Sequence, residues 1–471
     1  MKNKRLPFIL LSGFLPASFG MAASGQTNFI IINLDDSGYG DFSVNGALNY
    51  LTPNIDRMAA EGMRFTHFLS AQPVSSASRA GLLTGCYSNR IGFAGALFPH
   101  STTGIAAGEE TIAEVLKKKG YRTGAFGKWH LGHHRQFLPL QNGFDEYFGL
   151  PYSNDMLPER NQNKKDYPPL PLIEGNDMIE ANPDQSQLTT RYTEKAVDFL
   201  QRSRNTPFFI YLAHSMPHIP LAVSDKFKGK SRQGLYGDVM MEIDWSVGQI
   251  LEALRRNKLE GNTLVIVTSD NGPWLNFGNH GGSAGGLREG KNTTFEGGNR
   301  VACIMQWKGT MPAGTICNRL CSQIDLLPTF AAIAGAPLPP LTIDGVNILP
   351  LLKGDSDATP REFFAHYFSK NNLEAISGDR FKLIFPHNAR TYSQFPAGQD
   401  GKGGKMGTLK IEEAELYDLR RDPGERYNVI DQFPEEARKL SEAADRIRAR
   451  LGDDLTGVKG TENRPIGQLN Q

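Results

Sequence analysis

Short apolar runs alternate along this chain with longer segments in which apolar residues recur at helical spacing. The runs are rich in β-branched residues and end in polar or glycine-rich turns, as buried strands do. They cover residues 29–34, 207–213, 264–268 and 301–307. The helical segments cover residues 53–62, 110–119, 187–202 and 236–256. This alternation predicts an α/β fold built on a large, mostly parallel mixed sheet with helices on its faces.

The sequence changes character after about residue 360. Short strands are expected at residues 363–368 and 381–385, and residues 434–451 have the pattern of an amphipathic helix. We therefore expect a large unit over residues 25–360 and a smaller α+β unit with an antiparallel sheet over residues 361–471.

The N-terminus has the pattern of a secretory signal. Three cationic residues among the first five precede an apolar stretch at residues 6–19, and small residues follow at 22–24. The stretch is short for a bilayer and two prolines interrupt it. We therefore expect residues 1–24 to be a cleaved signal peptide. The mature chain would then be periplasmic or secreted, without stable insertion into a membrane.

The charge balance argues against a polyanionic partner. The chain has 471 residues and a formal net charge of +1. Such a balance gives no general attraction to a phosphate backbone, so no nucleic-acid partner is expected.

Four cysteines, Cys86, Cys303, Cys317 and Cys321, would be exported with the chain. An oxidising compartment would permit disulfides among them, but the sequence does not determine a pairing. Cys317 and Cys321 have the spacing of one helical face, and buried free thiols are an equally good interpretation.

Oxygen donors follow two of the predicted strands directly. Asp35 and Asp36 come after the first strand, and Asp270 and Asn271 come after the run at 264–268. The carboxyl ends of parallel strands are where α/β sheets bind ligands. Three carboxylates and an amide suit calcium better than zinc, which prefers nitrogen and sulfur. Either pair alone is also compatible with a loop that caps a helix.

Residues 75–85 read Ser-Ser-Ala-Ser-Arg-Ala-Gly-Leu-Leu-Thr-Gly. This run resembles the maturation motif of the type I sulfatases, in which Ser75 stands at the position that becomes formylglycine. The resemblance implies a Ser-type site, oxidised by an anaerobic-type sulfatase-maturating enzyme. In the family one hydroxyl of the aldehyde hydrate attacks sulfur, and the second one expels sulfate. Alone, the run is also compatible with a serine-capped loop and short helix.

Further segments resemble the same family in the expected order, from residue 28 to about residue 428. Residues 127–132 read Gly-Lys-Trp-His-Leu-Gly, which implies that Lys128 binds sulfate and that His130 is the base that assists sulfate release. From the residues alone, side chains at i and i+2 would project to one side of an extended segment.

Two more segments complete the set of residues implied by the resemblance. The Pro-His-x-Pro pattern at residues 217–220 implies that His218 protonates the leaving alcohol. The glycine-rich segment at 286–301 implies that Lys291 binds sulfate and that Glu296 and Arg300 support the loop. Arg79 would hold the hydroxyl at position 75 and the neighbouring ligands. The implied calcium ligands are Asp35, Asp36, Asp270, Asn271 and the modified Ser75.

The resemblance implies an alkaline-phosphatase-like fold and an exported, arylsulfatase-like hydrolase of the bacterial carbohydrate type. A glycosaminoglycan or mucin glycan with sulfated galactose or N-acetylgalactosamine is the favoured substrate. His387 and Arg390 in the smaller unit are the residues expected to contact sugar. Two alternatives stay open: a phosphodiesterase or phosphonate monoester hydrolase of related fold, and a glycan-binding protein without catalysis.

Overall fold

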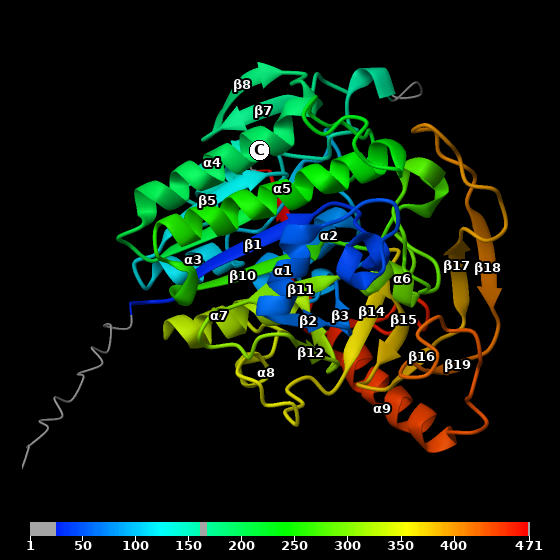
Figure 1. Cartoon of the computed structure of the whole chain (residues 1–471). Coiled ribbons are helices and arrows are strands. Elements are labelled where there is room, and N and C mark those ends of the chain that lie inside the picture. Colours follow the sequence, from blue (N-terminus) through cyan, green and yellow to red (C-terminus); the bar gives the residue numbers. More distant parts are fainter. Residues whose placement is uncertain (1–24, 161–166, 470–471) are drawn as a thin grey trace, which may run out of the picture.

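The structure is a computed structural model that describes residues 25–160 and 167–469. The predicted signal segment, residues 1–24, lies outside the described residues. Ten strands form one sheet in the order β12-β2-β11-β10-β1-β9-β5-β6-β7-β8, which runs across the centre of Figure 1. Strands β10, β1, β9, β5 and β6 are mutually parallel, whereas β11, β7 and β8 are antiparallel to their neighbours. The predicted mixed, mostly parallel sheet is therefore confirmed.

The elements of the large unit are as follows. Its strands in this sheet are β1 (Asn28–Leu34), β2 (Met63–Phe65), β5 (Arg122–Gly127), β6 (Glu146–Gly149), β7 (Pro171–Glu174), β8 (Asp177–Ala181), β9 (Phe208–Ala213), β10 (Thr263–Ser269), β11 (Cys303–Gln306) and β12 (Thr315–Cys317). Its helices are α1 (Pro53–Glu61), α2 (Ser75–Thr84), α3 (Ile112–Lys117), α4 (Leu188–Ser203), α5 (Gly234–Arg256), α6 (Glu296–Asn299), α7 (Leu326–Ala334) and α8 (Leu349–Leu352). The four predicted strands and four predicted helices of this unit all exist, with ends shifted by no more than a few residues.

Both faces of the sheet are covered. Phe29 and Ile31 pack in one apolar core with α2, α3 and α7, and Ile30 and Ile32 pack in a second core with α1, α4 and α5. Alternate residues of a strand point to opposite faces, so a strand that is buried on both sides is apolar throughout. This burial explains the uninterrupted apolar runs in the sequence.

The smaller unit lies beside the sheet. Strands β14 (Phe364–Phe368), β15 (Asn372–Ser377), β16 (Phe381–Ile384) and β19 (Glu415–Asp418) form an antiparallel sheet. Helix α9 (Pro434–Leu451) packs on it, and β17 (His387–Thr391) and β18 (Gly407–Ile411) form a separate hairpin at one edge of the molecule (Figure 1). The end of the chain then returns to the large unit, where β20 (Gly467–Gln468) pairs with β4 (Thr103–Gly104). The boundary at residue 360 stays a prediction.

All four cysteine thiols are free and buried. Cys317 ends β12 and Cys321 begins β13 (Cys321–Ser322), which pairs with β3 (Phe68–Leu69). The suggested shared helical face is therefore wrong, because this segment follows sheet edges. Among the described residues, no helix combines the length and the apolarity that a bilayer crossing requires.

Candidate active site

Four parallel strands deliver polar side chains to one edge of the sheet. Asp35 and Asp36 directly follow β1, and Asp270 and Asn271 directly follow β10. Lys128 follows β5, and β9 leads into the loop that carries His218. Because neighbouring parallel strands end together, residues far apart in sequence converge there.

The donors at the ends of β1 and β10 contact one another directly. The Asn271 Nδ2 group donates to Asp36 Oδ1 at 2.7 Å, and the Asp36 backbone N–H donates to Asp270 Oδ1 at 3.1 Å. Asp35, Asp36 and His218 also bring potential ligand atoms within 4.8 Å of one another. The carboxylates of Asp35, Asp36 and Asp270 and the amide of Asn271 are all buried.

Ser75 is the first residue of α2 and lies against this acidic group. Its hydroxyl donates to Asp35 Oδ1 at 3.1 Å, and Lys128 Nζ lies 3.4 Å from the same hydroxyl oxygen. The residue is buried except where it faces the cavity described below. The start of a helix carries partial positive charge and unpaired N–H groups, so this end of α2 favours an anion.

Two buried cations balance the carboxylates around Ser75. Lys128 Nζ contacts Asp35 Oδ2 at 2.5 Å, and Arg79 Nη2 lies 2.9 Å from Asp270 Oδ2. Burial would raise the pKa of Asp35, but the charges of Lys128 and His218 hold that pKa well below its usual value. Burial and the Asp35 charge raise the pKa of Asp270, and burial lowers that of Lys128. Gly127 lets the end of β5 lie close to β9, where the Lys128 N–H donates to the Ala213 carbonyl oxygen at 2.8 Å. A Cβ at position 127 would lie 1.8 Å from that oxygen.

His130 lies at the same site, with a backbone conformation that the sequence did not predict. The residue has φ of 64°, so the segment after β5 is not extended at His130, and the prediction of an extended segment there is wrong. Its Nε2 lies 2.9 Å from the Leu97 carbonyl oxygen and must therefore carry the hydrogen, which leaves Nδ1 as an acceptor. Nδ1 has no partner among the described residues. Burial and the Lys128 charge hold the pKa of His130 well below its usual value, so the ring is neutral.

His218 and Lys291 lie near the second carboxylate oxygen of Asp36, Oδ2, whereas Asn271 contacts Oδ1. His218 Nε2 lies 3.5 Å from Asp36 Oδ2, and its Nδ1 lies 2.5 Å from the Ile219 carbonyl oxygen. Lys291 Nζ contacts Asp36 Oδ2 at 2.8 Å and lies 4.2 Å from the centre of the Trp274 ring. Burial would lower the pKa of Lys291, but the Asp36 and Asp35 carboxylates raise it, so the ammonium is charged.

A cavity of about 360 Å³ opens above these groups. It is lined by six of the residues expected from sequence, namely Ser75, Lys128, His130, His218, Lys291 and Arg390. Arg390 comes from β17 and lies over Phe368, which also lines the cavity. With the exception of His387, the structure therefore brings the predicted site residues together: six line one cavity, and Arg79 and the oxygen donors are buried next to them.

His387 does not line this cavity. Its side chain is buried in the smaller unit, where Nδ1 lies 2.7 Å from the Phe385 carbonyl oxygen and Nε2 lies 3.3 Å from Glu374. On a β-strand, residues 387 and 390 point to opposite faces, and only Arg390 faces the cavity. The expected sugar contact of His387 is therefore not supported.

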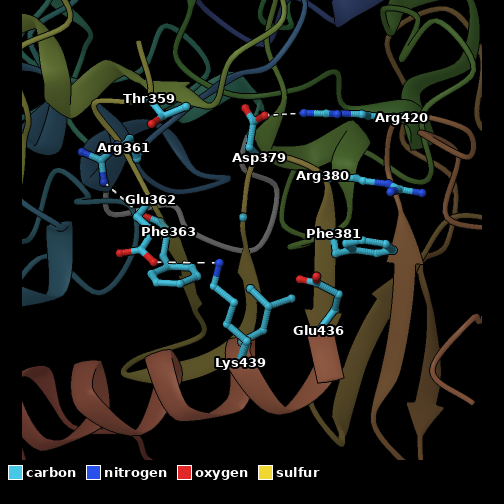
Figure 2. Close-up of a pocket in the computed structure, with 12 residues that line it drawn as sticks. Thr359, Arg361, Glu362, Phe363, Asp379, Arg380, Phe381, Arg420, Glu436 and Lys439 are labelled. Carbon is cyan, nitrogen blue, oxygen red and sulfur yellow. Dashed lines mark hydrogen bonds and ion pairs between the residues drawn. The ribbon is translucent and has the colours of Figure 1, made fainter. Parts of the chain in front are cut away.

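A second cavity, of about 580 Å³, lies in the smaller unit and contains none of the expected residues. Figure 2 shows two ion pairs in its lining: Arg420 contacts Asp379 at 2.5 Å, and Lys439 lies 4.0 Å from Glu362. Its other two cations, Arg361 and Arg380, pair with carboxylates outside the lining, Asp325 and Asp418. Since each of its cations is paired with a carboxylate, we do not regard this cavity as an active site.

The oxygen donors fit a hard cation such as calcium. The set contains three carboxylate groups, and Asn271 Oδ1 is a buried amide oxygen without a partner in the described part of the chain. An orphaned buried acceptor next to carboxylates is typical of a ligand position, because such an oxygen otherwise loses its hydration without compensation.

Comparisons with known proteins agree with this geometry. The family model described as sulfatase matches residues 27–336, and one described as N-sulphoglucosamine sulphohydrolase, C-terminal, matches residues 290–400. The chain belongs to the sulfatase family. It is accordingly a hydrolase of sulfuric esters with the alkaline-phosphatase-like fold of that family.

Individual relatives resemble this sulfatase over most of their length. Bovine arylsulfatase A is 38% identical over 92% of this chain and 89% of its own. Mouse N-acetylgalactosamine-6-sulfatase is 39% identical over 87% of this chain and 84% of its own. A Bacteroides thetaiotaomicron structure, described under the metabolism of multiple glycosaminoglycans, has a TM-score of 0.76 at 30% identity and covers 91% of this sulfatase and 100% of its own chain.

Several cavity residues were not expected from sequence, and three of them bear on the chemistry of the site. Ser153 accepts from Lys128 Nζ at 3.2 Å, Trp274 packs against Lys291, and Asp155 lines the cavity. Trp274 follows Asp270 within four residues, which was a usable signal. Ser153 and Asp155 lie in a loop without a motif, so only the packing of that loop reveals them.

Proposed function

We propose that this sulfatase removes sulfate from a sulfated carbohydrate, with calcium and with formylglycine formed from Ser75. The observation that carries the proposal is the position of Ser75 between Asp35 and Lys128, at the floor of a cavity that also presents His130 and His218. Calcium would polarise a sulfate oxygen, and formylglycine hydrate would supply a nucleophilic hydroxyl with a second hydroxyl on the same carbon.

The proposed calcium ligands are Asp35, Asp36, Asp270, Asn271 and residue 75. Lys128 and Lys291 would neutralise sulfate oxygens from two sides, since both ammonium groups line the cavity. Arg79 would hold Asp270 in place through their buried ion pair.

Proton transfer falls to the two histidines. His218 would donate the proton on Nε2 to the leaving alcohol, because that nitrogen is on the side of Asp36 and its Nδ1 is held by a backbone carbonyl. His130 would accept a proton through the unpartnered Nδ1 during sulfate release. Two histidines whose ring nitrogens have different partners suit a reaction that needs both an acid and a base.

A carbohydrate substrate is supported by the relatives and by the cavity. A relative at 39% identity is named for N-acetylgalactosamine-6-sulfate, so we propose a sulfated galactose or N-acetylgalactosamine unit of a glycosaminoglycan or mucin glycan. Arg390 is the proposed sugar contact, since this residue of the hairpin in the smaller unit lines the cavity. Export guided by residues 1–24 and oxidation of Ser75 by an anaerobic-type maturating enzyme complete the proposal.

Sulfate release from a panel of sulfated mono- and oligosaccharides tests this function. The protein must first be shown by mass spectrometry to have a residue 75 lighter than serine by two hydrogens. Matched phosphate esters distinguish the related phosphodiesterase or phosphonate hydrolase activity. Clear preference for phosphate, or no release from any sulfated sugar, would contradict the proposal.

Replacing His218 by alanine should lower kcat for sugar sulfates by about 10²- to 10⁴-fold, the usual contribution of a general acid. The loss should be much smaller for para-nitrophenyl sulfate, because nitrophenolate leaves without a proton. Steady-state rates on both substrates provide the comparison. An equal loss on both would show that His218 does not act as the acid.

Calcium should raise the melting temperature of chelator-treated protein, since a ligand that binds only the folded state stabilises it by about 2.7 kcal/mol at a hundredfold excess over Kd. Differential scanning calorimetry measures this without reference to activity. The Asp36→Asn variant should respond less, because one carboxylate of the donor set is lost. The same shift in both proteins would place calcium elsewhere.

A further inference from the structure

Asp155 lines the cavity, yet none of the roles above uses it. It lies in the loop after β6, two residues beyond Ser153, which contacts Lys128. Its side chain is half-buried, and its Oδ1 accepts no hydrogen bond from any described residue. A shielded carboxylate oxygen without a donor costs free energy and calls for a partner from outside the chain.

The backbone that carries Asp155 is held firmly. The Met156 N–H donates to the Ser153 carbonyl at 3.1 Å and closes a turn with Asn154 and Asp155 at its centre. The Asn154 side chain donates to Gln185 at 3.0 Å, and Gln185 donates back to the Asn154 carbonyl at 2.9 Å. The backbone of Asp155 is therefore fixed at the cavity wall, and its carboxylate moves only by rotation about χ1 and χ2.

The charges around the cavity are arranged unevenly. Lys128, Lys291 and Arg390 line it as cations, whereas Asp155 is a carboxylate for which no ion pair is found among the described side chains. A carboxylate accepts hydrogen bonds and repels anions. The group of the substrate that faces Asp155 must therefore be a hydrogen-bond donor without negative charge, such as a hydroxyl or an amide N–H.

We propose that Asp155 is a specificity residue, which accepts a hydrogen bond from one hydroxyl or amide N–H of the sugar and disfavours sugars with a second sulfate at that position. This inference rests on the proposed carbohydrate sulfatase function. It narrows the substrate to a sugar unit in which a free donor accompanies the sulfate that is removed. Buried polar groups that lose such a partner discriminate strongly against the wrong substrate.

A cycle of single changes in enzyme and substrate tests the pairing. The kcat/KM of wild type and Asp155→Ala is measured on the preferred sulfated sugar and on analogues that lack one donor at a time. In wild type, loss of the paired donor should lower kcat/KM by about 10- to 100-fold, the range for a hydrogen bond to a charged group. In Asp155→Ala the same analogue should cause almost no further loss, since coupled changes are not additive.

Two further variants sharpen the result. Asp155→Asn keeps an acceptor but removes the charge, and it should narrow the preference for singly over doubly sulfated sugar. Asp177→Ala, an exposed residue of β8, is the matched control and should behave as wild type. If the loss from Asp155→Ala and the loss from each missing donor multiply independently at every position, the inference about Asp155 is wrong, while the proposed function stands. Absence of sulfate release from every sugar by wild type would overturn the proposed function and this inference with it.

Discussion

Replacing Ser75 by alanine is expected to abolish sulfate release, with kcat lower by on the order of 10⁶-fold, as when other hydrolases lose their covalent nucleophile. Alanine has no oxygen to oxidise, so neither hydroxyl of the proposed hydrate can form. The remaining contacts of Lys128 and Lys291 with sulfate would bind substrate without turning it over. Initial rates of sulfate release on the best sugar of the panel measure the effect.

The variant should still fold, because Ser75 contributes only its contacts with Asp35 and Lys128 to the buried site. Cooperative unfolding close to that of wild type would separate loss of chemistry from loss of structure. Ser356→Ala, on an exposed loop, is the control and should retain full activity. Residual activity above about one per cent in Ser75→Ala would rule out the assigned role, given the loss expected for a nucleophile.

Replacing Lys382 by methionine is expected to lower the free energy of unfolding by about 3–5 kcal/mol. Lys382 Nζ is fully buried, and it contacts Glu296 at 3.0 Å, Glu425 at 2.8 Å and the Thr294 carbonyl at 2.7 Å. Methionine has a similar length but no charge, so two buried carboxylates would lose a cation that they share. Urea denaturation gives the stability difference.

This network also connects the smaller unit to the catalytic loop. Thr294 lies three residues after Lys291, and Tyr392 in the smaller unit donates its hydroxyl to the Lys291 carbonyl at 2.5 Å. The KM for sulfate esters should therefore rise in Lys382→Met, together with the loss of stability. Lys308→Met is the matched control, since Lys308 is 36% exposed beside Glu61 and Glu260 and should contribute only about 0–1 kcal/mol. A loss of similar size in both variants would contradict the argument.

Much of the fold was predictable because its signals are local. Strand β1 has a continuous apolar run since both faces of the sheet are covered, and apolar periodicity placed helix α9 at residues 434–451. The support expected from the glutamate and arginine of the 286–301 segment is consistent with the buried Glu296–Arg300 ion pair. The free cysteines and the return of β20 to β4 depended on contacts across the chain, which no local pattern records.

The sequence by itself determined which residues could perform chemistry, because oxygen donors follow directly on buried strands and the motif residues lie in short segments. Only the tertiary structure decided which of them share a cavity. His130 enters it through a positive φ, and Arg390 faces it whereas His387 is turned toward Glu374. Asp155 acquires its place from a loop held by distant partners. Side-chain direction in loops is set by non-local packing and hydrogen bonds, so it cannot be read from spacing alone.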